Sequence, residues 1–164
     1  MNKEIATVFG VGYMPWAPGT WGSAIAIAFV WAAHGFLGFP GVVAIGGLVT
    51  FWGWYATEKY TKETGNHDPS EVVIDEVAGM FVALSPVSAG LWFSGADPWL
   101  LPWPGVVAAF VLFRIFDMWK PGPVGRADRR NDAWGVMLDD LVAGAIAAIG
   151  VVLLAVLSHL VLGS

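Results

Sequence analysis

Hydrophobic residues gather into five long runs along the chain, and most polar residues fall between these runs. The runs cover roughly residues 22–39, 41–57, 74–93, 102–119 and 137–162. About 20 helical residues cross the hydrocarbon core of a bilayer, so runs of this length are typical of membrane helices. The pattern predicts an all-α, polytopic membrane bundle with four to five apolar helices. The first two runs are short for a full crossing and also fit a tight helical hairpin that does not fully span.

Composition favours the same class of protein. Hydrophobic residues make up 57% of the chain and charged residues 13%, with ten tryptophans and a mean hydropathy of +0.66. Soluble domains are far less apolar, and 164 residues suit one domain over residues 1–164. The stretch 1–13 lacks the features of a cleavable signal peptide. Because the chain has no cysteine, disulfides, a thiolate nucleophile and cysteine-ligated metals are excluded.

The basic residues are distributed unevenly between the two ends of the predicted helices. The connections 38–41 and 94–101 and the C-terminal tail contain no Lys or Arg. All eight basic residues lie before the first run, in the two longer connections or near the end of the fourth run: Lys3, Lys59, Lys62, Arg114, Lys120, Arg126, Arg129 and Arg130. By the positive-inside rule, the N-terminus and the two longer connections are expected to be cytoplasmic. The same orientation brings the polar motifs described below to the cytoplasmic side.

A stretch rich in glycine and proline, residues 10–23, precedes the first apolar run. Its spacing predicts an ordered loop or a broken helix entry. Backbone amides in such a loop can cradle an anion, and Thr20 and Ser23 can cap the helix while their hydroxyls face the same spot. The alternative is a simple turn, since the stretch matches neither the P-loop nor the dinucleotide fingerprint.

The second motif, residues 67–80, opens the third run. Asp75 and Glu76 fall in the first helical turn, where the helix dipole favours carboxylates in any protein. Gly79 would let a neighbouring helix approach closely and bring its own polar groups to the pair. His67 is either a proton donor or acceptor near neutral pH or an ordinary solvated loop residue.

The third motif, residues 113–123, ends the fourth run. Arg114, Asp117 and Lys120 recur at steps of three, so they share one helix face and can form ion pairs. Cations suit the C-terminus of a helix, whereas a carboxylate such as Asp117 is disfavoured there unless a cation meets it. Pro121 is expected to end the helix.

The fifth run opens with the adjacent carboxylates Asp139 and Asp140, which point about 100° apart on a helix. Three helices thus bring five carboxylates to one side: Asp75, Glu76, Asp117, Asp139 and Asp140. Their mutual repulsion favours a shared divalent cation, and a donor set made only of oxygen favours Mg²⁺ or Mn²⁺. With the cations nearby, this arrangement suits a phosphate ester at the membrane surface.

Four blocks, GYMPWAPGTWGS, HDPSEVVIDEVAGM, FRIFDMWKPGP and GVMLDDLVAG, resemble in order and spacing those of the phosphatidylglycerophosphatase A family of bacterial inner-membrane enzymes. The resemblance implies a multi-pass, Mg²⁺-dependent phosphatase that converts phosphatidylglycerophosphate into phosphatidylglycerol and phosphate, with its site facing the cytoplasm and no nucleic-acid partner. The motif positions carry over as Asp68, Asp75, Glu76, Arg114, Asp117, Lys120, Asp139 and Asp140. The chain departs from the family pattern mainly between residues 124 and 134, a stretch that includes Asp128.

Together these observations predict a mechanism. Some of Asp75, Glu76, Asp117, Asp139 and Asp140 hold Mg²⁺, which lowers the pKa of a bound water. Arg114 and Lys120 neutralise the phosphate oxygens, with Thr20 and Ser23 as further phosphate contacts.

Proton transfer is assigned to three residues. Asp68 or Asp75 deprotonates the attacking water, and His67 is a candidate acid for the leaving group. A covalent aspartyl-phosphate on Asp117 is an alternative, although the Asp-x-Asp pattern of haloacid-dehalogenase phosphatases is absent.

Two other functions compete with the phosphatase. A cation-coupled transporter would gather its carboxylates nearer the midplane, commonly in repeated halves, and the sequence contains no such repeat. A phosphotransferase acting on lipid headgroups would share Mg²⁺ and the interface, but the signature of CDP-alcohol phosphotransferases is absent.

Overall fold

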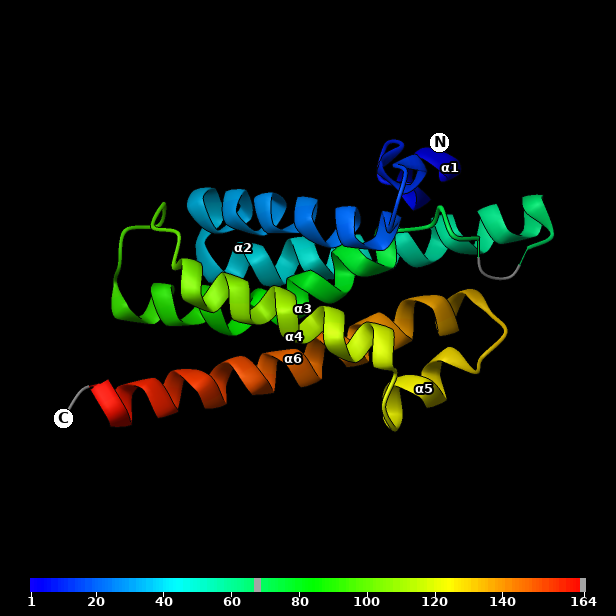
Figure 1. Cartoon of the computed structure of the whole chain (residues 1–164). Helices are drawn as coiled ribbons and strands as arrows, with labels where there is room; N and C mark the ends of the chain where they lie inside the picture. Colours follow the sequence, from blue (N-terminus) through cyan, green and yellow to red (C-terminus); the bar gives the residue numbers. More distant parts are fainter. Residues whose placement is uncertain (67–68, 163–164) are drawn as a thin grey trace.

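The structure, a computed structural model, describes residues 1–66 and 69–162 as a bundle of helices (Figure 1). Its elements are α1 (Asn2–Ala6), the 3₁₀ turn η1 (Val11–Tyr13), α2 (Pro18–Thr64), α3 (Ile74–Ser94), α4 (Trp103–Trp119), α5 (Pro123–Asp128) and α6 (Ala133–Leu162). The described residues contain no strand, which confirms the all-α prediction.

Three of these helices, α2, α3 and α6, are long and apolar enough to cross a membrane. The chain is therefore an all-helical membrane protein. The third and fourth apolar runs match α3 and α4 to within a residue at each end, while α6 begins four residues before the run predicted at 137. The total of four to five crossings stays a prediction.

Helix α2 contains both of the first two apolar runs and folds back on itself at Gly38. The residue has φ 66° and ψ −165°, a backbone conformation that residues other than glycine rarely adopt. A Cβ placed there would lie 2.0 Å from the indole ring of Trp92, so the close approach of α3 also requires glycine. The two arms of α2 run back alongside each other as a hairpin (Figure 1).

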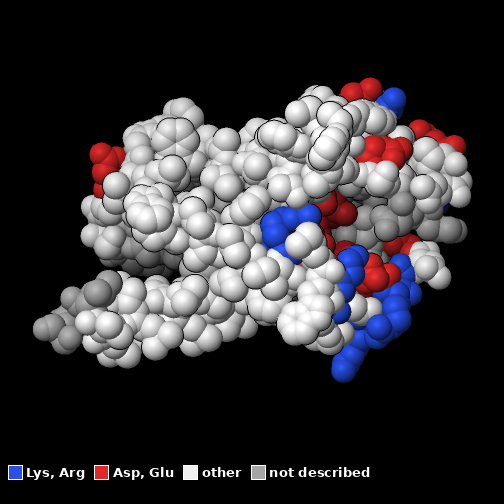
Figure 2. Space-filling view, in the orientation of Figure 1, with Lys and Arg blue, Asp and Glu red and all other residues white. Residues whose placement is uncertain are grey.

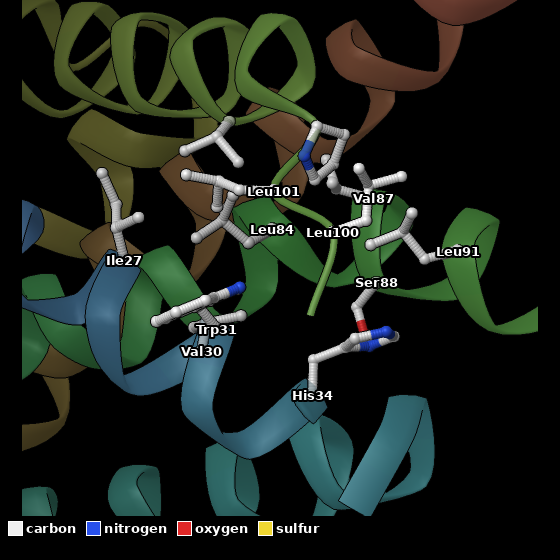
Figure 3. A pocket seen from close by; sticks show the side chains of 12 residues that line it. Ile27, Val30, Trp31, His34, Leu84, Val87, Ser88, Leu91, Leu100 and Leu101 are labelled. Carbon is white, nitrogen blue, oxygen red and sulfur yellow. The ribbon is translucent and has the colours of Figure 1, made fainter. Parts of the chain in front are cut away.

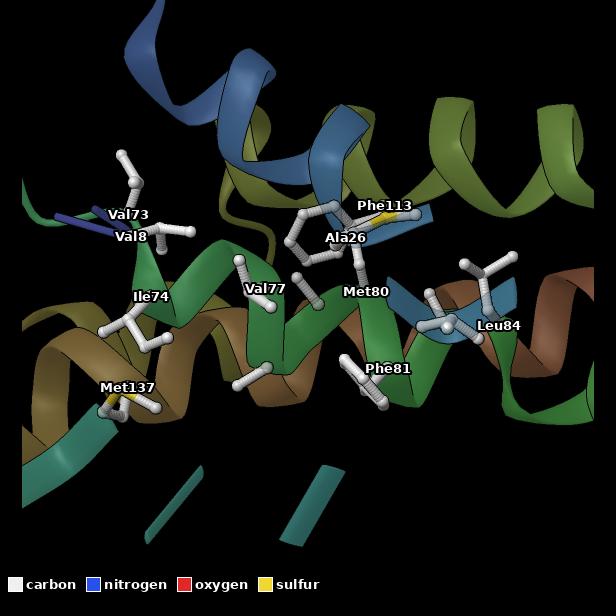
Figure 4. Packing of buried hydrophobic residues seen from close by; sticks show 14 of the residues in the cluster. Val8, Ala26, Val73, Ile74, Val77, Met80, Phe81, Leu84, Phe113 and Met137 are labelled. Carbon is white, nitrogen blue, oxygen red and sulfur yellow. The ribbon is translucent and has the colours of Figure 1, made fainter. Parts of the chain in front are cut away.

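Helix α3 lies at the centre of the bundle and packs against α2, α4 and α6. Its buried residues include Met80, which meets the equally buried Phe113 of α4 in the core (Figure 4). At the other contact, a Cβ on Gly53 of α2 would touch both Ile74 of α3 and Met137 of α6. Helix α3 is therefore held on three sides, which fixes the position of its first turn.

The chain before α2 forms an ordered loop, as the density of glycine and proline predicts. It contains η1 and several residues with left-handed backbone, including Gly10, Trp16 and Ala17. The predicted capping by Thr20 and Ser23 is wrong. Helix α2 already begins at Pro18, its N-cap is Ala17, and no side chain caps it; the Ser23 hydroxyl instead donates to the Gly19 carbonyl at 2.8 Å.

Candidate active site

A polar cleft of about 370 Å³ lies where the start of α3, the end of α4, α5 and the start of α6 come together. Basic and acidic side chains gather over this end of the molecule, whereas most of the remaining visible face is uncharged (Figure 2). The cleft is lined by Val72, Asp75, Glu76, Asp117, Lys120, Asp128, Arg130, Asn131, Gly135, Val136, Asp139 and Asp140. All five carboxylates predicted to share one site therefore line one cleft.

Three of these carboxylates converge most closely. One oxygen from each of Asp75, Glu76 and Asp140 lies within 4.8 Å of the others. Helices α3 and α6 approach closely enough for this because Gly79 has no side chain: a Cβ there would lie 2.7 Å from the Asp140 carbonyl oxygen. The close approach predicted for Gly79 is confirmed, and it brings Asp140 beside the first turn of α3.

Arg114 connects two of the acidic side chains at the edge of the cleft. Its Nη1 donates to Oδ2 of Asp117 at 2.6 Å and lies 4.0 Å from Oε1 of Glu76. The predicted pairing of Arg114 with Asp117 is thus confirmed, and it explains how a carboxylate is tolerated in the last turn of α4. Within the described residues, Nε of Arg114 and Oε2 of Glu76 are buried and have no hydrogen-bond partner.

Lys120 pairs with different partners from those predicted. It lies just beyond α4 with φ 48°, since Pro121 ends the helix as expected. Its ammonium group donates to Oδ2 of Asp139 at 2.8 Å and to Asp128 of α5. Burial lowers the pKa of Lys120, but the hydrogen bonds to these two carboxylates outweigh it and the net pKa is raised. Lys120 is therefore a fixed positive charge in the cleft.

Contacts behind the cleft hold the segment that leads into α3. The Val73 amide donates to the Ala6 carbonyl at 3.0 Å, which joins the N-terminal segment to this chain. The Tyr60 hydroxyl donates to Glu71 at 2.8 Å and lies 3.3 Å from the Tyr13 hydroxyl. The end of α2 and the N-terminal segment thus both brace the chain just before Asp75.

The remaining predicted site residues lie elsewhere. Thr20 and Ser23 are not among the residues that line the cleft, although Gly19 beside them approaches it. His67 and Asp68 lie outside the described residues. Conversely, Asp128 lines the cleft and binds Lys120, a role that the sequence analysis did not assign to it. The Pro-Gly-Pro turn after Lys120 was the signal that the chain folds back and returns Asp128 toward Lys120.

A second, mostly apolar pocket lies in the other half of the bundle (Figure 3). There His34 Nδ1 of α2 and the Ser88 hydroxyl of α3 are 2.7 Å apart and buried. Ser88 follows Asp75 by 13 residues, about 20 Å along a helix at 1.5 Å per residue. Buried polar side chains on neighbouring membrane helices commonly hydrogen-bond to each other, which accounts for this pair.

Fold and cleft define a class of protein: an all-helical membrane protein that gathers paired carboxylates and cations at one end of its bundle. The sequence profile of the phosphatidylglycerophosphatase A family matches residues 4–155. The chain belongs to that family, which confirms the resemblance of the four sequence blocks and supports a phosphatase.

Individual relatives agree with this family. The phosphatidylglycerophosphatase A of Escherichia coli is 37% identical over 145 residues, covering 88% of this chain and 77% of the relative. The Haemophilus influenzae protein of the same name is 33% identical over 146 residues, covering 88% and 83%. A Bacteroides thetaiotaomicron protein named "Putative phosphatidylinositol-3-phosphatase" is 39% identical over 150 residues, covering 88% and 87%. No solved structure matches the chain.

Proposed function

We propose that this protein removes the terminal phosphate from phosphatidylglycerophosphate, releasing phosphatidylglycerol and inorganic phosphate, with Mg²⁺ bound in the polar cleft. The observation that carries the proposal is the composition of that cleft. Carboxylates that converge from two helices lie beside two cations, Arg114 and Lys120, at the end of helices suited to a membrane. The names of the Escherichia coli and Haemophilus influenzae relatives support the choice of substrate.

The donor set fits a hard divalent cation. Asp75, Glu76 and Asp140 offer only oxygen atoms within 4.8 Å of one another, and oxygen ligands are those that Mg²⁺ prefers. Glu76 Oε2 is buried and unpartnered among the described residues, which is costly unless a ligand satisfies it. Asp117 and Asp139 are already paired with Arg114 and Lys120, so we assign the ion to the first three carboxylates. When bound, Mg²⁺ would polarise a phosphate oxygen and lower the pKa of a water molecule.

The protein's own side chains supply the remaining steps. The side chain of Arg114 is 15% exposed, and its guanidinium group can donate to phosphate oxygens while Asp117 fixes its position. Lys120, held by Asp128 and Asp139, adds a second positive charge as negative charge moves to the leaving glycerol oxygen.

Proton transfer requires a base for the attacking water and an acid for the leaving group. Asp68 and Asp75 are the two candidates for the base, and His67 is the candidate acid. Because Asp75 also belongs to the proposed metal set, a base role for Asp68 would separate the two tasks.

The membrane orientation is part of the proposal. Arg126 on α5 and Arg129 directly after it are exposed next to the cleft, and positive charge accumulates on the cytoplasmic side of membrane proteins. We infer a bacterial inner-membrane location with the cleft facing the cytoplasm, and four or five crossings, five when α4 and both arms of α2 all span.

The test is a phosphate-release assay on the purified protein in detergent. Phosphatidylglycerophosphate is supplied with Mg²⁺, with EDTA, or with EDTA followed by excess Mg²⁺. We expect release only when Mg²⁺ is present, and no release from native protein under any of these conditions would refute the substrate assignment.

A second substrate is tested because one relative is named for a different lipid. Phosphatidylinositol 3-phosphate is assayed in parallel at matched micellar concentration, because the Bacteroides thetaiotaomicron relative is 39% identical. We expect kcat/KM to be higher for phosphatidylglycerophosphate. The reverse order would transfer the assignment to the inositol lipid while leaving the phosphatase chemistry intact.

A further inference from the structure

The start of α2 and the end of α4 meet directly beside the polar cleft. A Cβ placed on Gly19 would lie 1.9 Å from Oε1 of Glu76 and 3.3 Å from Nη1 of Arg114. The backbone of α2 therefore touches the two side chains that border the cleft on this side. Both side chains retain some exposure, 14% for Glu76 and 15% for Arg114.

Exposed large apolar side chains lie within a few residues of this junction on both α4 and the chain that starts α2. Trp16, three residues before Gly19, is 90% exposed, and Trp21 is 44% exposed. On α4, Met118 is 70% exposed and Trp119 is 72% exposed. Exposed indole and thioether groups thus lie close in sequence to the residues at which α2 reaches the cleft.

The positions of these side chains differ from those of ordinary lipid-facing residues. Trp16 precedes the first residue of α2 and Trp119 is the last residue of α4, so both lie at helix ends rather than along a span. Trp16 also adopts φ 67°, a conformation unfavourable for a residue with a side chain. Tryptophan has an apolar body and a polar N–H, and it suits the depth where phospholipid glycerol and headgroups lie.

We propose that this junction is the lateral entrance for the lipid substrate, and that Trp16, Trp21, Met118 and Trp119 contact its acyl chains. The proposal rests on the proposed function and adds the surface that binds the part of the substrate away from the phosphate. A phospholipid diffusing in the bilayer meets these side chains at interface depth, and its phosphate then reaches Arg114 without leaving the membrane. The absence of a side chain at Gly19 lets the α2 backbone lie directly against Glu76 and Arg114.

We assign a phospholipid to this surface because apolar and cationic groups are adjacent here. Arg114 is buried behind the junction with an unpartnered Nε among the described residues. A diacylglycerol body with an anionic phosphate matches an apolar rim around a guanidinium group. A second copy of the chain is the competing occupant, and the test below distinguishes it.

The experiment compares two substrates that share a headgroup, one with acyl chains and one without them. Dioleoyl phosphatidylglycerophosphate is presented in mixed micelles, and its deacylated form, glycerophosphoglycerophosphate, is presented as a soluble monomer. The variants are Trp16→Ala, Trp119→Ala and the double substitution. The matched control is Trp103→Ala, since Trp103 is 69% exposed at the opposite end of α4.

For the double variant we expect KM for the dioleoyl substrate to rise about tenfold, because two large aromatic contacts are lost. We expect kcat to be unchanged for both substrates, KM for the deacylated substrate to change less than twofold, and Trp103→Ala to behave as wild type. An equal KM rise for both substrates, or an equal effect of Trp103→Ala, would contradict the proposed entrance.

A change in oligomeric state on size exclusion, with kinetic constants intact, would instead assign the surface to a second copy of the chain. If wild-type protein hydrolyses neither substrate, the proposed function itself fails, which is a different result from any of these.

Discussion

Nη1 of Arg114 donates to Oδ2 of Asp117 at 2.6 Å, across one turn at the end of α4. Both side chains are about 15% exposed, so the pair lies largely out of water. Arg114 also lies within 4.0 Å of Glu76 on α3. The pair therefore joins the ends of two helices at the edge of the polar cleft, and the position of Arg114 depends on the charge of Asp117.

Asp117→Asn should lower kcat on phosphatidylglycerophosphate strongly while the protein still folds. The amide keeps the shape of the side chain but loses the charge that orients Arg114. We expect a loss of about 100-fold or more, as for removal of one preorganised group that stabilises transition-state charge. The measurement is steady-state phosphate release, with circular dichroism to check helix content.

The matched control is Asp97→Asn. Asp97 is exposed in the connection between α3 and α4 and accepts the Trp99 amide at 2.8 Å. It should retain wild-type activity. If Asp117→Asn kept full activity, or if Asp97→Asn lost as much, the catalytic role of the Arg114 and Asp117 pair would be wrong.

The features that could be predicted from the sequence are governed by local chemistry. The apolar runs at 74–93 and 102–119 match α3 and α4 because burial and a following proline or glycine fix their ends. Arg114 and Asp117 could be paired because a spacing of three on a helix puts them on one face. Their partner Glu76 on α3 required the tertiary structure.

The partners of Lys120 could not be predicted from spacing alone. They depend on how residues 121–132 fold back, and that path contains Gly122 with φ 45° and the short helix α5, whose Val124 and Ala127 are buried. A six-residue helix of this kind is stabilised by tertiary packing rather than by its own propensity. The predicted capping at the N-terminus of α2 was also wrong, because Pro18 already occupies the first helical turn and Thr20 falls inside the helix.

Divalent cations should stabilise the protein as well as activate it. Mg²⁺ bound by Asp75, Glu76 and Asp140 would offset the repulsion of three converging carboxylates. Binding to the folded state alone adds about 2.7 kcal/mol when the ion is at 100 times its Kd. Thermal unfolding in detergent should therefore shift upward with Mg²⁺ and return on EDTA addition.

Glu76→Gln should abolish most of this thermal shift, because it removes one charge and one strong oxygen ligand. Glu63→Gln is the control, since Glu63 is exposed near the end of α2 and away from the cleft lining. An unchanged Mg²⁺ shift in Glu76→Gln would exclude Glu76 from the metal set. A shift that choline chloride at the same ionic strength reproduced equally would indicate an ionic-strength effect.

Gly79→Ala should disturb the crossing of α3 and α6. The added Cβ would lie 2.7 Å from the Asp140 carbonyl and 2.5 Å from the Phe113 ring. Overpacking of this kind destabilises by about 1–3 kcal/mol, and the displacement would separate Asp140 from Asp75. We expect a lower unfolding temperature together with weaker Mg²⁺ binding.

Gly90→Ala on the same helix is the control. A Cβ at Gly90 has no neighbour within 4 Å among the described residues, so alanine should leave stability unchanged or raise it by about 0.5–1 kcal/mol through helix propensity. Equal destabilisation by the two substitutions would show that helix α3 tolerates neither and that the crossing is not the cause.

The proposed orientation of the bundle can be tested because the chain has no cysteine, so a single introduced thiol is labelled without background. Arg126→Cys on exposed α5 and Asp97→Cys in the opposite connection lie at the two ends of the bundle. A membrane-impermeant maleimide applied to intact spheroplasts should label Asp97→Cys only, whereas both variants should react after the membrane is permeabilised.

Labelling of Arg126→Cys alone in intact spheroplasts would invert the topology and place the cleft outside the cytoplasm. Labelling of both would mean that α4 does not cross, since residues 97 and 126 would then share one side.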